Sequence, residues 1–174
     1  LDLCARFFPT VQAFFMYYVP ALSFQERELR WAEQTYGIKI IRIPHFDVSR
    51  LINTGVYNAV GDDETRDIGI ADVYGYLRSE TGIHWIAAGE RIADSIVRRA
   101  MIVKDGTING KRGRIFPIAH WRKANVLAHI KRNNLRVSEE SRVLGYSFRD
   151  LRPETLALVK QHYPQDYEKV IALY

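Results

Sequence analysis

The sequence predicts an α/β fold: a doubly wound, mostly parallel sheet of the Rossmann-like type with a helical C-terminal extension. Three observations predict it. Between residues 11 and 43 the pattern is strand, helix, strand, and a crossover helix implies that the two strands are parallel. A helix, a strand and another helix follow between residues 66 and 100. From residue 136 onward the pattern is helical throughout.

The first strand–helix–strand unit has sequence signals at each boundary. Residues 11–19 are aromatic and β-branched, which predicts a buried strand. Ser23 and Glu26 have the spacing of a capping box, so a helix is expected to begin there and to end before Gly37. Residues 38–43 predict the next strand. A short helix tail is expected before this unit, at the start of the chain.

The middle of the chain adds a further helix and strand before a glycine turn. Residues 44–65 have no regular period and include the acidic run 62–64, so they are expected to be irregular. Residues 66–79 predict a helix and residues 84–88 a buried strand. We expect the turn at Gly89 to lead directly into the next helix.

The remaining segments are a basic loop and several helices. Residues 104–114 are rich in glycine and in basic side chains, which indicates a mobile loop able to close on an anion, or else an ordinary solvated loop. Helices are expected at residues 122–133, 138–145, 153–163 and 164–174. The predicted division is an α/β domain over residues 1-135 and a helical extension packed on it over residues 136-174.

Composition narrows the class of protein. A chain of 174 residues is long enough for one domain with a sizeable core. Its net charge of +5 favours anionic ligands, and nucleotides, inorganic anions and nucleic acid all stay open. Cys4 is the single cysteine, which excludes an internal disulfide and fits a cytoplasmic setting. No apolar stretch reaches the length of a membrane span, so no membrane partner is expected.

The helix after Gly89 carries the candidate site. On a helical wheel Arg91, Ser95 and Arg98 share one face. The opposite face is apolar and is expected to pack on the sheet; it comprises Ile92, Ala93, Ile96, Val97 and Ala100. Ligands bind where a strand of an open α/β sheet passes into a helix, and a helix N-terminus with arginines suits phosphate or sulfate. The alternative is a solvated helix face with ordinary surface arginines.

Several other chemistries have no sequence signature. A Walker-type phosphate loop, a Gly-x-Gly-x-x-Gly loop and a Gly-x-Ser-x-Gly elbow are all absent from the sequence. No two histidines have His-x-x-x-His spacing, so a helical zinc site is not expected. With one cysteine, no iron–sulfur cluster is expected either, and no residue is proposed as a metal ligand.

Two blocks of the sequence resemble one family. Residues 89–98, Gly-Glu-Arg-Ile-Ala-Asp-Ser-Ile-Val-Arg, resemble the Gly-x-Arg-x-x-x-Ser-x-x-Arg signature of the phosphoadenosine phosphosulfate (PAPS) reductase family. Residues 117–121 and 125–130 resemble that family's Pro-Leu-x-x-Trp…Asp-Val…Tyr-Ile segment. The resemblance covers residues 1–130, and residues 163–167 are similar to a tail of phage- and prophage-type relatives.

The resemblance implies the PP-loop fold of the adenine nucleotide α-hydrolase type and an adenine nucleotide as substrate. Arg91 and Arg98 would act in catalysis by stabilising charge on the departing phosphate or sulfate. The expected contacts with the nucleotide and its phosphates come from Gly89, Arg91, Ser95, Arg98, Arg99, Lys111, Arg112 and Arg114. Residues 104–114 would form a lid. The chemistry would be reduction of PAPS, or cleavage of ATP between its α and β phosphates with adenylylation during sulfur transfer, which implies Mg²⁺.

This chain also departs from the family pattern. The family's Ser-Gly-Gly-x-Asp-Ser phosphate loop precedes its first helix, so we expect that loop and the first strand upstream of Leu1. The Glu-Cys-Gly-x-His motif is absent, and reduction would need an outside thiol. His120 and His129 replace an aspartate and a tyrosine. A non-catalytic nucleotide-sensing subunit or a nucleic-acid-associated regulatory subunit is therefore the alternative, with a protein partner or a homodimer left open.

Overall fold

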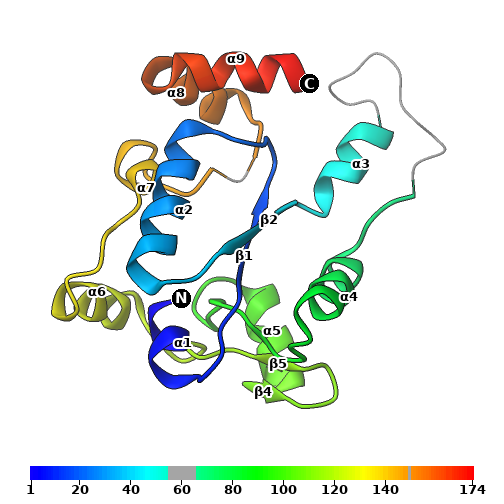
Figure 1. Ribbon diagram of the computed structural model, residues 1–174, viewed down its shortest axis with the longest axis vertical. Coiled ribbons are helices and arrows are strands. Elements are labelled where there is room, and N and C mark those ends of the chain that lie inside the picture. The colour runs from blue at the N-terminus through cyan, green and yellow to red at the C-terminus, as the bar shows by residue number, and fades with distance from the viewer. Residues whose placement is uncertain (55–65, 149) are drawn as a thin grey trace. The chain divides into compact units, whose positions relative to one another are not determined.

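The computed structural model describes residues 1–54, 66–148 and 150–174 (Figure 1). The acidic run 62–64 lies outside the described residues. The elements confirm a mixed α/β protein. In chain order they are α1 (Asp2–Phe7), β1 (Ala13–Tyr17), α2 (Ser23–Tyr36), β2 (Ile40–Pro44), α3 (Asp47–Asn53), α4 (Ile70–Thr81), β3 (Ile86–Ala87), α5 (Ile96–Asp105), β4 (Ile108–Asn109), β5 (Arg114–Ile115), α6 (Lys123–Arg132), α7 (Glu139–Val143), α8 (Pro153–His162) and α9 (Pro164–Leu173).

The chain forms two compact units, and each is described by itself. Unit 1 comprises Leu1, Phe8–Val73 and Val137–Tyr174. Unit 2 comprises Asp2–Phe7 and Tyr74–Arg136. One boundary of this division, between Arg136 and Val137, lies one residue from the predicted one. The boundary between Val73 and Tyr74 was not predicted, and the C-terminal helices belong to the same unit as the first strands.

Unit 1 contains the predicted parallel strand pair. β1 and β2 pair in parallel, in register from Ala13 opposite Ile40 to Tyr17 opposite Pro44, and α2 is the crossover between them. Gly37 ends α2 in the left-handed conformation with φ of 64°, as the sequence predicted. Glycine adopts that conformation without the steric cost that a side chain would add.

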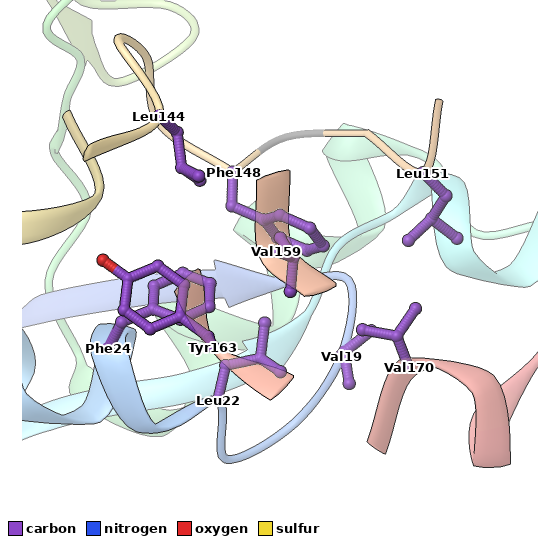
Figure 2. Packing of buried hydrophobic residues seen from close by; sticks show 9 residues of the cluster. All are labelled: Val19, Leu22, Phe24, Leu144, Phe148, Leu151, Val159, Tyr163 and Val170. Carbon is purple, nitrogen blue, oxygen red and sulfur yellow. The ribbon is translucent and has the colours of Figure 1, made fainter. Parts of the chain in front are cut away.

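The core of unit 1 joins segments far apart in the sequence. Phe24 of α2 is fully buried, and its ring lies 4.5 Å from the ring of Tyr163 and 6.0 Å from that of Phe148, centroid to centroid. The buried cluster in Figure 2 comprises Val19, Leu22, Phe24, Leu144, Phe148, Leu151, Val159, Tyr163 and Val170. Apolar burial of this kind is the main stabilising contribution to folding, so the C-terminal helices are part of the core of unit 1.

The predicted capping box of α2 is wrong. The helix begins at Ser23, so the capping position is Leu22, whose own side chain makes no capping hydrogen bond. The Ser23 hydroxyl donates to Asp166 at 2.6 Å, and Glu26 pairs with Arg42 at 2.9 Å. Partners distant in sequence thus take both side chains away from the local motif. A second difference is α3, which lies inside the segment expected to be irregular.

Unit 2 contains a small three-stranded sheet with the order β3–β5–β4. β3 and β5 are parallel, whereas β4 and β5 form an antiparallel hairpin. The prediction of a loop over residues 104–114 is therefore wrong: the segment comprises the end of α5 and most of this hairpin. Its core is formed by Ile102, Phe116 and Ala119, with Ala88, Ile92 and Met101 packed against them.

Gly113 allows the hairpin to approach β3 closely. Its φ is +56°, and a Cβ at this position would lie 2.6 Å from both the Nε2 and the carbonyl oxygen of His84. The Gly113 carbonyl accepts a hydrogen bond from the N–H of Ile86 at 2.8 Å. A side chain here would thus be strained and would also separate the two strands.

Candidate functional site

The segment after β3 is a turn and not the start of a helix. The Asp94 carboxylate accepts a hydrogen bond from the Arg91 backbone N–H at 2.9 Å, and the N–H of Asp94 donates back to the Arg91 carbonyl at 3.1 Å. The N–H of Ile92 donates to the Ala119 carbonyl at 2.9 Å, which anchors the turn to the core of unit 2. A local carboxylate thus satisfies the backbone groups that would otherwise begin a helix.

Helix α5 begins only at Ile96, with Ser95 as its cap. Ser95 is extended, with φ of −166°, and its hydroxyl accepts a hydrogen bond from the Arg98 N–H at 3.1 Å. The predicted helical face containing Arg91, Ser95 and Arg98 is therefore wrong, because α5 includes only the last of these. The opposite apolar face does not pack on a sheet either: Ile96 is 84% exposed and Val97 is 78% exposed.

Arg91 has its charge neutralised within the turn. Its Nε and Nη2 donate to Asp94 Oδ1 at 2.9 and 2.6 Å, and both side chains are mostly buried. Burial acts to raise the pKa of Asp94, but the hydrogen bonds from Arg91 outweigh it and hold that pKa below its ordinary value. Arg91 Nη1 takes no part in these bonds, but the Asp94 carboxylate cancels most of the positive charge that Arg91 would offer to an anion.

Arg98 is the more available arginine. Its side chain is 48% exposed, and its guanidinium lies 3.9 Å from both Glu90 Oε1 and Asp94 Oδ2, which is too long for a hydrogen bond. Exposed ion pairs at such distances contribute little to stability. Arg98 therefore keeps its donors at the N-terminus of α5, where the backbone N–H groups are also positive.

Arg114 also lies beside the Glu90 carboxylate, but its side chain is mostly buried. Its Nη2 is 3.3 Å from Glu90 Oε2, and its guanidinium carbon lies 4.9 Å from the Phe116 ring centroid and 5.6 Å from that of Tyr74. Its Nε is buried and has no hydrogen-bond partner among the described residues. Arg114 thus packs against two aromatic rings and pairs with Glu90, so we assign it a positioning role.

The other predicted contacts are divided between the two ends of α5. Gly89 is exposed at the start of the turn, and Arg99 is exposed in the first turn of the helix. Arg112 pairs with Asp105, the last residue of α5, at 2.7 Å, and Lys111 is its exposed neighbour. Ten helical residues extend about 14 Å. The structure therefore brings Arg114 to the turn but places the backbones of Lys111 and Arg112 near the far end of α5.

A polar cluster in unit 1 was not predicted from the sequence. Tyr18 and His45 directly follow β1 and β2, their rings stack at 4.6 Å between centroids, and the Tyr18 hydroxyl donates to Asp47 Oδ2 at 3.4 Å. Burial, followed by the charge of Asp47, raises the pKa of Tyr18 to about 12, and burial lowers the pKa of His45. The signal was available, since ligands bind at the carboxyl ends of parallel strands.

A Mg²⁺ site does not fit the residues beside the turn. The two carboxylates there, Glu90 and Asp94, are each paired with arginine. Within residues 1–54, 66–148 and 150–174 there is also no group of three or more His, Cys, Asp or Glu side chains arranged to hold a metal ion.

Comparisons with known proteins were made at three levels. No protein-family model, curated protein or solved structure matches this chain. Among the described helices, none has the length and apolar character needed to cross a membrane.

Proposed function

We propose that the turn after β3 and the N-terminus of α5 bind the phosphate or phosphosulfate group of an adenine nucleotide, as in a PAPS-reductase-like enzyme domain. The observation that carries the proposal is the position of Arg98. It presents an exposed guanidinium, whose ion-pair distances to described carboxylates are both 3.9 Å, on the Ser95-capped N-terminus that follows a parallel strand. Anions bind well at such helix termini.

The residues around this anion would have different roles. Arg98 and the N–H groups of the first turn of α5 would contact the anion directly and stabilise charge as it develops. Arg91 would shape the turn through Asp94, and Arg114 would hold Glu90 in place. The reaction would be PAPS reduction by an outside thiol or cleavage of ATP with adenylylation. The motif resemblance supports both.

The proposal also covers the topology of the sheet and the cellular compartment of the protein. A doubly wound sheet of the adenine nucleotide α-hydrolase type is supported by two parallel pairings, β1 with β2 and β3 with β5. A cytoplasmic setting is supported by the use of a single cysteine, Cys4, which is free. A protein partner or a homodimer is compatible with the proposal but has no supporting contact of its own.

One observation favours the second candidate, a non-catalytic nucleotide-sensing subunit. Asp94 neutralises Arg91, so one of the two arginines expected to act in catalysis is held by a carboxylate in the protein itself. An arginine paired with a carboxylate in this way can help to form the wall of a binding site but adds little net charge to it. Binding of a nucleotide without turnover would support this candidate over the enzyme.

Calorimetric titration with ATP, PAPS and adenosine 3′,5′-bisphosphate tests the proposal. Replacing Arg98 by alanine should weaken binding by at least about tenfold, as expected for loss of a charge-assisted hydrogen bond. Arg132→Ala is the matched control, because Arg132 is also an exposed arginine in a helix of unit 2. Equal affinities of the wild type and the Arg98 variant for all three nucleotides would overturn the site.

A further inference from the structure

Charge is distributed unequally between the two units. Unit 2 contains 14 lysines and arginines against 5 aspartates and glutamates, a formal net charge of +9. The rest of the chain contains 11 against 15, a net charge of −4. The overall value of +5 therefore conceals a strongly basic unit, and a field of one sign over one unit attracts polyanions to it.

Most carboxylates of unit 2 form ion pairs with arginines of the same unit. Asp2 pairs with Arg6, Asp94 with Arg91 and Asp105 with Arg112, and Glu90 faces Arg114. The cations that are exposed and have no ion pair with any described residue form a larger set. They are Arg99, Lys104, Lys111, Arg122, Lys123, Lys131 and Arg132. Seven such cations are more than one nucleotide can neutralise, whereas a polymer of phosphodiesters can contact many of them at once.

The tip of the β4–β5 hairpin brings an exposed aromatic ring close to these cations. Trp85 is 43% exposed, and its Cη2 lies 4.0 Å from where a Cβ on Gly110 would be, next to Lys111 in the chain. Arg112 Nη1 pairs with Asp105 Oδ2 at 2.7 Å, which ties the tip to the end of α5, where Lys104 is exposed. We name Trp85, Lys104 and Lys111 the hairpin-tip surface.

The half-buried Arg78 holds this surface in place. Arg78 of α4 donates through Nε to the His84 carbonyl at 2.8 Å and through Nη2 to the Arg112 carbonyl at 2.7 Å. These bonds fix the residue before Trp85 and the residue after Lys111 to the same guanidinium. A preorganised surface binds with less loss of conformational entropy than a mobile loop does.

We propose that the hairpin-tip surface binds single-stranded nucleic acid. Lys104 and Lys111 would contact phosphates of the backbone, and Trp85 would stack on an unpaired base. Cationic surfaces with an exposed aromatic ring suit single strands, because the bases of a duplex are not free to stack on a side chain. The proposal is independent of the nucleotide site, which lies at the other end of α5.

Fluorescence anisotropy of a labelled 20-nucleotide DNA strand, titrated with the full chain over a range of salt concentrations, tests this proposal. The double variant Lys104→Gln/Lys111→Gln should weaken binding and reduce the slope of log K against log salt by about 1.4. Trp85→Ala should weaken binding by about tenfold, the expected effect of losing one stacked base. Circular dichroism of each variant establishes that it is folded.

The matched control is Arg30→Gln/Lys39→Gln, which removes two exposed cations from unit 1 and changes the net charge equally. It should leave the affinity and the salt slope unchanged. Equal losses in the two double variants would overturn the proposal, as would an unchanged salt slope in the Lys104/Lys111 variant. Tighter binding of the duplex, or full competition by polyglutamate at equal charge, would overturn it too, since neither ligand offers free bases.

Discussion

Asp166 caps a helix that begins 143 residues before it. Its Oδ2 accepts hydrogen bonds from the Ser23 backbone N–H at 2.7 Å and from the Ser23 hydroxyl at 2.6 Å. Its Oδ1 accepts one from Lys169 Nζ at 2.8 Å, and only 1% of Asp166 is exposed. Burial acts to raise the pKa of Asp166, but these hydrogen bonds hold it below its ordinary value. The C-terminal helix thus completes the N-terminus of α2.

Removal of this carboxylate should destabilise unit 1. We expect Asp166→Ala to lower the free energy of unfolding by about 2–3 kcal/mol, because a helix N-terminus loses its cap and charge-assisted bonds are lost. Urea denaturation measures the change. Glu168→Ala, at an exposed position of the same helix, should cost no more than about 0.5 kcal/mol. Equal midpoints for the two variants would show that the cap contributes nothing.

Glu140 should make stability depend on pH. It is 9% exposed and accepts a hydrogen bond from the Phe148 N–H at 3.1 Å, and burial raises its pKa above the ordinary value of 4.5. The folded state thus binds this proton more tightly than the unfolded state. The contribution of Glu140 to stability is therefore full below about pH 4.5 and is lost as the pH rises through the raised folded pKa.

The variant Glu140→Gln removes that titration while an amide oxygen still accepts the bond. We expect the melting temperature of the variant, relative to the wild type, to be higher at about pH 8 than at about pH 4. Calorimetric scans at both pH values provide the measurement. Glu154→Gln, at an exposed position of α8, is the control and should show no such trend. A difference between wild type and Glu140→Gln that stays constant with pH would contradict the prediction.

The sequence was informative where local signals and tertiary structure agree. The aromatic and β-branched run before Pro20 contains a strand. Gly37 ends α2 because the C-terminal cap of this helix has a left-handed backbone, which glycine adopts readily. It was misleading where a distant side chain replaced a local partner. Ser23 and Glu26 have capping-box spacing, yet Asp166 and Arg42 take them. Such pairings depend on the folded chain and leave no local pattern.

The candidate site shows the same distinction. A helical wheel makes Arg91 and Arg98 equivalent, because it assumes that both belong to one helix. Asp94 accepts the backbone N–H of Arg91 and neutralises its side chain, which separates the two arginines into a structural and an available one. Asp94 was visible in the sequence, but its competition with the helix for backbone hydrogen bonds could not be read from side-chain periodicity.

Gly113 should be intolerant of any side chain. We expect Gly113→Ala to lower the free energy of unfolding by at least about 2 kcal/mol, because alanine is strained at φ of +56° and its Cβ would clash with His84. Gly110→Ala is the matched control in the same hairpin, since the nearest atom to its Cβ is Trp85 Cη2 at 4.0 Å. Similar unfolding midpoints for the two alanine variants would show that the close approach to His84 is not needed.

Asp94 and Arg98 should affect anion binding in opposite directions. Asp94→Asn removes a negative charge 3.9 Å from Arg98 and also releases Arg91, while its amide oxygen can still accept the Arg91 backbone N–H. We expect the affinity for ATP and adenosine 3′,5′-bisphosphate to rise about threefold in this variant. Arg98→Ala should lower it.

Calorimetry on the two single variants and the double variant checks this relationship. If Arg98 is the main contact, adding Asp94→Asn to Arg98→Ala should raise the nucleotide affinity by less than about threefold. If the released Arg91 replaces Arg98 as the contact, the full increase of about threefold should remain. Asp105→Asn is the control, because it releases Arg112 at the far end of α5 and should leave nucleotide affinity unchanged. Weaker binding in Asp94→Asn would mean that the Arg91–Asp94 turn itself forms the nucleotide contact, and Arg98 would then lose the role assigned to it.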